Sequence, residues 1–224
     1  PAISVYTLVL GFVSITSSLV DRTGKVAHAC ARAWSRLILV TTGVRVQVSG
    51  LERVPIDGAY VFVSNHQSIY DIPILFSALP FQLRIIAKVS LGLFPVLGWH
   101  LRYTGHLLVD RARIGAVTML QVAGLMKRGH SLIVFPEGTR SRDGRVGPFK
   151  GGLFLMAVEA GLPIVPVAIR GSRHVMLKGR LMTCPGDVSV SVHDPIPTCG
   201  MGRDDVRALA VRAREIVTQM ASAS

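Results

Sequence analysis

Apolar residues occur along the chain in two alternating patterns of spacing. Short apolar runs, such as residues 59–64 and 131–135, are typical of strands that are buried on both faces. Between these runs lie longer stretches in which apolar residues recur every three or four positions, a spacing typical of helices packed along one side. Strands and helices that alternate in this way predict an α/β domain with a largely parallel central sheet flanked by helices.

The predicted elements cover most of the chain after residue 43. Strands are expected at residues 44–49, 59–64, 82–87, 106–109, 131–135, 163–169 and 188–193. Helices are expected at residues 72–79, 90–99, 114–127 and 151–160. A last amphipathic helix is expected to begin near Asp204 and Asp205, because carboxylates favour the positive end of a helix dipole. Residues 171–184 show neither pattern of apolar spacing and are expected to form a loop.

The N-terminal part of the chain has a different character. Residues 1–20 carry no charge and are rich in Ile, Val, Leu and Phe, which predicts an anchor helix embedded in a membrane or lying on it. Residues 25–41 predict a second helix, in which arginines flank Trp34; this combination suits either lipid headgroups or simple packing on the domain. We therefore expect a membrane-associated helical segment of residues 1–42, followed by an α/β domain of residues 43–224.

Composition and charge narrow the classes of function. Half of the 224 residues are hydrophobic and only 17% are charged, yet the net charge is +12. A chain that is both apolar and basic favours an anionic lipid surface as its partner. Nucleic acid is the competing interpretation, but only 6% of the residues are aromatic and no nucleic-acid-binding motif is present, so we expect no nucleic-acid partner. The three cysteines include no Cys-x-x-Cys pair and predict neither a disulfide framework nor a zinc site.

A histidine and an aspartate stand five positions apart between a buried strand and a helix. His66 and Asp71 lie in the stretch Asn65-His66-Gln67-Ser68-Ile69-Tyr70-Asp71, on a predicted strand-to-helix turn that holds side chains at the protein surface. An aspartate that accepts a hydrogen bond from one imidazole nitrogen leaves the other nitrogen free to act as a base. The alternative is that Asp71 merely begins the helix and His66 is an ordinary loop histidine. No third ligand has suitable spacing, so no metal site is predicted.

Further polar residues follow other predicted strands. Lys88, Arg111 and the segment 137–140 all come directly after strand ends, and the carboxyl ends of parallel strands are where sites in α/β sheets gather. A glycine such as Gly138 allows backbone amides to approach a ligand closely. Arginines can bind a phosphate with paired hydrogen bonds. The loop that follows is also basic, but for Arg142 and Arg145 a solvated loop is the preferred interpretation.

The order and spacing of these blocks resemble one family of enzymes. The blocks are His66 with Asp71, Gly105-His106-Leu107-Leu108-Val109-Asp110-Arg111, and Phe135-Pro136-Glu137-Gly138-Thr139-Arg140. They resemble the glycerolipid acyltransferase family, and most closely the bacterial 1-acylglycerol-3-phosphate (lysophosphatidate) acyltransferases. The resemblance runs from about residue 44 to residue 192. One departure is Leu108, where the family usually has phenylalanine.

The resemblance implies a fold like that of glycerol-3-phosphate acyltransferase and an O-acyltransferase of phospholipid biosynthesis. Such an enzyme moves a fatty acyl group from acyl-CoA or acyl-carrier protein to the free hydroxyl of lysophosphatidate and gives phosphatidic acid. It needs no cofactor other than the thioester co-substrate. By the resemblance, His66 is the general base and Asp71 orients it. The substrate-binding residues that it implies are Lys88, Arg111, Glu137, Gly138, Thr139 and Arg140.

Three points stay open from the sequence. Glu137 could hydrogen-bond a glycerol hydroxyl, or it could hold Arg140 in position. The acceptor could also be another lysophospholipid, a lyso-ornithine lipid or glycerol 3-phosphate, because relatives with these blocks use such acceptors. From a different class, the chain could be a non-catalytic membrane-surface protein.

The resemblance implies a protein of the bacterial inner membrane whose site faces the cytoplasm, with lysophosphatidate, an acyl thioester and an anionic membrane surface as partners.

Overall fold

The computed structural model describes residues 2–21, 23–93, 97–109, 121–122, 124–125, 128–177, 179 and 182–222. Its seven strands form one sheet in the order β1-β7-β6-β2-β5-β3-β4. Strands β6, β2, β5, β3 and β4 are mutually parallel, whereas β7 is antiparallel to β6 and pairs in parallel with β1. The prediction of a largely parallel sheet is thus confirmed. The strands are β1 (Val44–Ser49), β2 (Val61–Ser64), β3 (Leu83–Lys88), β4 (Leu107–Val109), β5 (Ser131–Val134), β6 (Ile164–Arg170) and β7 (Gly186–Val192).

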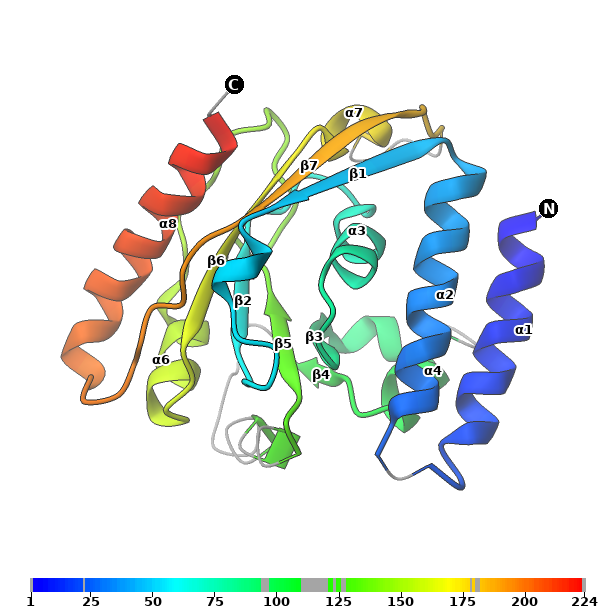
Figure 1. Cartoon of the computed structure of the whole chain (residues 1–224), viewed down its shortest axis with the longest axis horizontal. Helices are drawn as coiled ribbons and strands as arrows, with labels where there is room; N and C mark the ends of the chain where they lie inside the picture. Colours follow the sequence, from blue (N-terminus) through cyan, green and yellow to red (C-terminus); the bar gives the residue numbers. More distant parts are fainter. Residues whose placement is uncertain are drawn as a thin grey trace.

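Helices cover both faces of this sheet (Figure 1). In β2, Phe62 joins the hydrophobic core beneath α2 and α3, while Val61 and Val63 join the core beneath α6 and α8. This alternation follows from the two-residue period of a strand, and it makes β2 apolar throughout because both of its faces are covered. The α-helices are α1 (Ala2–Ser17), α2 (Lys25–Thr41), α3 (Asp71–Ala78), α4 (Leu97–Tyr103), α6 (Gly151–Glu159), α7 (Ser172–Val175) and α8 (Val206–Ser222), and the 3₁₀ turns are η1 (Leu51–Arg53), η2 (Val89–Leu93) and η3 (Arg203–Asp205).

The sequence predicted all seven strands, and it predicted β1 and α2 with the bounds that the structure has. The single helix expected at residues 90–99 was wrong, because the chain forms the short turn η2 there and α4 begins only at Leu97. The loop expected at residues 171–184 contains α7, which at one turn is too short to show a period. The helix expected at residues 114–127 lies mostly outside the described residues.

The parallel strands bring distant segments to one edge of the sheet. Strand β2 lies between β5 and β6, and β3 and β4 continue the sheet beyond β5. Because these strands all run in the same direction, their carboxyl ends meet at a single edge. The polar segments that follow β2, β5 and β6 therefore start side by side.

Helix α1 packs against α2 rather than on the sheet (Figure 1). Two hydrogen bonds join the helices: the indole N–H of Trp34 donates to Oγ1 of Thr7 at 2.8 Å, and the hydroxyls of Tyr6 and Thr41 lie 3.0 Å apart. The other side of α1 exposes apolar side chains, among them Phe12, which is 69% exposed, and Leu8, which is 57% exposed. Within the described residues, no helix has both the length and the apolar character that crossing a membrane requires.

Candidate active site

His66 and Asp71 are in direct contact just beyond the carboxyl end of β2. Nδ1 of His66 lies 2.8 Å from Oδ2 of Asp71, which is the contact that the five-residue spacing predicted. Asp71 is the first residue of α3 and is fully buried, while the imidazole keeps 12% of its side-chain surface exposed. The carboxylate is thus fixed inside the protein and the ring reaches its surface.

The hydrogen bonds around Asp71 decide which nitrogen of His66 carries the proton. Oδ2 of Asp71 also accepts from the backbone N–H groups of Gln67, at 2.7 Å, and Ser68, at 2.9 Å. A carboxyl oxygen that faces two N–H donors acts as an acceptor, so the third contact is an N–H of the imidazole. Nδ1 of His66 therefore donates to Asp71, and Nε2 keeps a lone pair that can take up a proton.

Neighbouring segments fix the position of the imidazole. The side-chain amide of Asn65 donates to the carbonyl of Ile169 at 2.9 Å and accepts from the N–H of that residue at 2.8 Å, which joins the end of β2 to β6. The ring of His66 stacks on Phe135 with a centroid separation of 4.1 Å and an interplanar angle of 18°. The N–H of Ser141 donates to the carbonyl of His66 at 2.7 Å. The histidine is therefore held through both its backbone and its ring.

Glu137 contacts the backbone beside the histidine. Its Oε1 accepts from the N–H of His66 at 2.8 Å, and its Oε2 accepts from the N–H of Gly147 at 3.0 Å. Burial raises the pKa of the Glu137 carboxyl above its usual value, while the two backbone donors act in the opposite direction. Glu137 thus ties the segment after β5 to His66. Its predicted contact with the acceptor stays a prediction.

The backbone conformation of the turn after β5 favours glycine at position 138. Gly138 has φ 75°, in the left-handed region that only glycine adopts at little cost, and its N–H donates to the carbonyl of Phe135 at 3.1 Å. A Cβ at this position would also lie 3.2 Å from Nζ of Lys150. Thr139 is exposed and Arg140 partly exposed, and the next residue is Ser141, which donates to His66. Arg140 therefore lies in a segment that is fastened directly to the histidine.

Two predicted binding residues are described only in part or not at all. The backbone of Lys88 ends β3 and pairs with Val109 of β4, so Lys88 lies at the same edge of the sheet as His66. The side chain of Lys88 and the whole of Arg111 lie outside the described residues. The structure thus brings together His66, Asp71 and the segment 137–140.

Sequence reasoning missed several groups that shape the site. Phe135, on which the imidazole stacks, belongs to the same block as Glu137, and an aromatic residue two positions from a predicted site residue was the available signal. Asn65 directly precedes His66, but its partner in β6 is 104 positions away in the chain. Gln67 donates from its side chain to the carbonyl of Gly144 at 2.7 Å. No feature of the sequence predicts the contact between Gln67 and Gly144.

Comparisons with known proteins agree on one family. A family model described as Acyltransferase matches residues 45–170, which include His66, Asp71 and the segment 137–140. A chloroplastic 1-acyl-sn-glycerol-3-phosphate acyltransferase of Brassica napus is 38% identical over 176 residues, covering 77% of this chain and 51% of the relative. The 1-acyl-sn-glycerol-3-phosphate acyltransferase alpha of Homo sapiens is 38% identical over 175 residues, covering 77% of this chain and 62% of the relative. The chain thus spans between half and two thirds of the length of these relatives.

A solved structure matches the chain along almost its whole length. The crystal structure of the 1-acyl-sn-glycerophosphate (LPA) acyltransferase PlsC from Thermotoga maritima has a TM-score of 0.80 and 29% sequence identity to this chain. The match covers 98% of this chain and 93% of that structure. The seven-stranded α/β architecture with its N-terminal helical pair is therefore one that a solved acyltransferase shares.

Proposed function

This chain belongs to the acyltransferase family, and on that premise we propose that it is a 1-acylglycerol-3-phosphate O-acyltransferase. It moves a fatty acyl group from a thioester donor to the free hydroxyl of lysophosphatidate and yields phosphatidic acid. The observation that carries the proposal is the contact of 2.8 Å between His66 and the buried Asp71, beside the segment 137–140. The two relatives and the solved structure described above bear names that state this activity.

The arrangement of hydrogen bonds suits general-base catalysis of acyl transfer. Nε2 of His66 takes the proton of the acceptor hydroxyl as the hydroxyl oxygen attacks the thioester carbonyl carbon. The tetrahedral intermediate then expels the sulfur, which receives the proton from the imidazolium, and the products are the new ester and a free thiol. Asp71 stabilises the imidazolium that forms in between. General-base assistance of this kind is typically about 10²- to 10⁴-fold.

The phosphate of the acceptor is assigned to the basic groups at the same edge of the sheet. Arg140 follows β5, which is the neighbour of β2, and its guanidinium can form paired hydrogen bonds with a phosphate. Lys88 and Arg111 are proposed to add positive charge from the ends of β3 and β4. In lysophosphatidate only two carbon atoms and an ester oxygen separate the hydroxyl from the phosphorus. A phosphate site beside the imidazole is therefore what this acceptor requires.

Glu137 is assigned two roles that are compatible. Its contacts with the backbone of His66 and Gly147 make it a positioning residue that fixes where the imidazole stands. Each carboxylate oxygen can accept more than one hydrogen bond, so a contact with a glycerol hydroxyl remains part of the proposal. Gly138 and Thr139 are assigned to the wall of the acceptor site, since they lie between Glu137 and Arg140 in the chain.

We also propose that residues 1–42 attach the α/β domain of residues 43–224 to the surface of a membrane. The outer side of α1 exposes a row of apolar side chains, and the basic Lys25 and Arg36 of α2 are exposed nearby. Apolar side chains beside basic ones suit an anionic lipid surface. A bacterial inner membrane, with the site on its cytoplasmic side, is the proposed location. A lipid acceptor would then reach His66 from the membrane.

A panel of acceptors tests the proposed activity. The purified protein is supplied with palmitoyl-CoA and in turn with lysophosphatidate, lysophosphatidylcholine, lyso-ornithine lipid and glycerol 3-phosphate, and free thiol is measured. We expect the highest kcat/KM for lysophosphatidate. We also expect the variant Arg140→Ala to raise the KM for lysophosphatidate by about tenfold or more, because a charge-assisted phosphate contact is lost. Equal turnover of lysophosphatidylcholine, or an unchanged acceptor KM in Arg140→Ala, would refute the assignment.

A further inference from the structure

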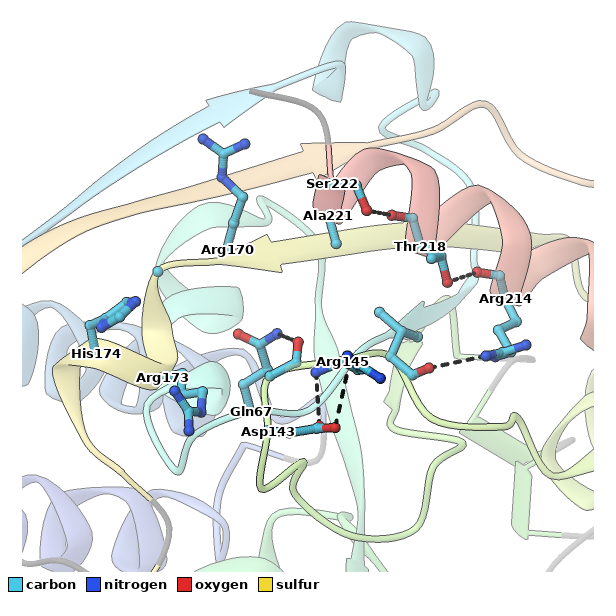
Figure 2. A pocket seen from close by; sticks show the side chains of 13 residues that line it. Gln67, Asp143, Arg145, Arg170, Arg173, His174, Arg214, Thr218, Ala221 and Ser222 are labelled. Carbon is cyan, nitrogen blue, oxygen red and sulfur yellow. Dashed lines mark hydrogen bonds and ion pairs between the residues drawn. The ribbon is translucent and has the colours of Figure 1, made fainter.

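Figure 2 shows a pocket lined by several basic side chains. It lies between the 141–147 loop, the end of β6, α7 and the last turns of α8, and its volume is about 520 Å³, within the range of small-molecule sites. Arginines from four different elements line it: Arg145 from the loop, Arg170 from β6, Arg173 from α7 and Arg214 from α8. His66 and Arg140 are not among its lining residues.

The pocket carries an excess of positive charge. Its only lining carboxylate within the described residues is Asp143, which already accepts from the hydroxyl of Ser141 at 3.0 Å and from the N–H of Arg145 at 3.1 Å. The side chain of Arg145 is 90% exposed, and its Nε is 3.9 Å from that carboxylate. Four guanidinium groups against one carboxylate favour a ligand with several negative charges, and guanidinium is the group best suited to phosphates.

Two of the arginines also hold the pocket in shape. Arg214 donates to the carbonyls of Gly147, at 3.0 Å, and Val146, at 3.2 Å, and so fastens the loop to α8. Arg173 donates to the carbonyl of Arg142 at 2.9 Å and fastens the same loop to α7. The hollow is therefore formed by contacts between elements rather than by one flexible loop.

The pocket is joined to the catalytic histidine through adjacent residues. Gln67, which follows His66 in the chain, lines the pocket, and its side-chain amide donates to the carbonyl of Gly144 at 2.7 Å. Ser141 begins the loop and donates from its N–H to the carbonyl of His66. The pocket therefore lies next to the reacting centre at the same edge of the sheet, with Gln67 between them.

The position of the pocket indicates which of the two substrates, lysophosphatidate or the acyl donor, it can bind. The phosphate of lysophosphatidate must lie close to the hydroxyl that His66 deprotonates, so a pocket that His66 does not line is unsuited to it. In acyl-CoA, by contrast, the whole pantetheine arm separates the thioester from the phosphates. Resting on the proposed function, we propose that this pocket binds the 3′-phosphorylated ADP end of an acyl-CoA donor. The diphosphate and the 3′-phosphate meet the arginines, and the pantetheine arm passes Gln67 to reach His66.

The position of the pocket in the whole molecule agrees with a donor from the aqueous side. Helix α8, which borders the pocket, and helix α1, with its exposed apolar face, lie at opposite ends of the long axis of the molecule (Figure 1). A lipid would approach from the α1 end, and a water-soluble nucleotide from the α8 end. An acyl-carrier protein would present one phosphate and a convex acidic surface, for which a concave pocket is less suited.

The double variant Arg145→Ala/Arg170→Ala tests the proposal. Within the described residues neither side chain holds a backbone carbonyl, so the fold is expected to be kept. We expect the KM for palmitoyl-CoA to rise by about tenfold or more and the KM for lysophosphatidate to stay unchanged. With S-palmitoyl-pantetheine, which lacks the nucleotide, wild type and variant should have the same kcat/KM. The matched control is Arg207→Ala/Arg212→Ala, which removes two exposed arginines of α8 that do not line the pocket.

The outcomes separate this proposal from the proposed function. If wild type and variant have the same KM for palmitoyl-CoA, the pocket does not bind the donor, although the acyltransferase assignment stands. A rise in KM for acyl-carrier protein alone would identify the carrier protein as the occupant and overturn the proposal. If no acceptor is acylated at all, the proposed function is refuted. The inference about the pocket is then tested by measuring the binding of CoA by calorimetry. The inference then requires CoA to bind wild type and the control more tightly than the variant, with inorganic phosphate as the competitor.

Discussion

One carboxylate oxygen of Asp71 accepts hydrogen bonds from three N–H groups. These bonds stabilise the turn after β2 and fix the orientation of the His66 ring. Two of the donors are the backbone groups of Gln67 and Ser68, and the third is Nδ1 of His66. The five-residue spacing predicted this contact because a strand-to-helix turn brings the two positions together. The contacts of Glu137 could not be predicted, because its partners are backbone N–H groups 10 and 71 positions away. Residue identity carries no signal for such backbone partners.

The same limit applies to the basic pocket. Arg145 was interpreted from the sequence as part of a solvated loop, and it is indeed highly exposed. The other arginines of the pocket come from β6, α7 and α8. No local pattern connects four residues that are spread over about a third of the chain, because only the packing of α8 against β6 brings them together.

The variant Asp71→Asn tests the role of the carboxylate. Asparagine has nearly the same shape and can still accept from the backbone N–H groups, so the fold should be kept. The amide oxygen in place of Oδ2 can also still accept from Nδ1 of His66, but the negative charge that stabilises the imidazolium is lost. We expect kcat to fall by about 10²- to 10⁴-fold with little change in either KM. Unfolding and steady-state kinetics measure the two effects, and a kcat within a factor of a few of wild type would remove Asp71 from the mechanism.

Elements were predictable where they were long and periodic. Helix α2 and strand β1 have the bounds that their patterns predict, because each has one side on the core and one exposed. The prediction failed at residues 90–99, where Gly92 and Gly98 interrupt the sequence and both lie against neighbouring backbone or side chains. It failed again at α7, whose single turn begins after Gly171 at φ 91°. Short elements are set by contacts rather than by their own periodicity.

The exposed side of α1 gives a prediction at the scale of one element. Phe12 is 69% exposed and is proposed to enter the lipid surface. Burying such a side chain is worth about 1.5–3 kcal/mol, so the variant Phe12→Ser should weaken binding to vesicles of phosphatidylglycerol and phosphatidylcholine by roughly tenfold or more. Co-sedimentation with vesicles measures it. The control Val211→Ser changes a side chain of α8 that is 50% exposed, and equal losses in both variants would show that α1 is not the membrane-contacting element.

At the scale of the whole molecule, three histidines from different elements are under the influence of one buried arginine. Arg84 of β3 is 2% exposed, and its charge acts on His28 of α2, His100 of α4 and His130 before β5. His100 is also hydrogen-bonded to Ser14 of α1 through Nδ1 at 2.9 Å. Burial, and secondly the charge of Arg84, lower the pKa of each of these three histidines to about 4. They are neutral in the folded protein at neutral pH.

This cluster predicts loss of stability in mild acid. Each histidine has a lower pKa in the folded chain than its ordinary value of 6.5, so the unfolded chain binds more protons between these values. The free energy of unfolding should therefore fall as the pH decreases from about 6.5 towards 4, before most carboxylates titrate. Chemical denaturation at pH 7.5 and pH 5 measures it, and calorimetry at pH 5 should show proton uptake on unfolding. Equal stability at the two pH values would be inconsistent with a buried neutral cluster.

The activity of the variant His66→Ala on lysophosphatidate tests the central claim most directly. Formation of phosphatidic acid from palmitoyl-CoA is compared with that of wild type, at equal vesicle binding and with an unchanged near-ultraviolet circular dichroism spectrum. The account predicts a rate at least about 10²-fold lower, since the base that takes the hydroxyl proton is gone. A folded, membrane-bound His66→Ala protein that still forms phosphatidic acid at a rate near that of wild type would contradict it.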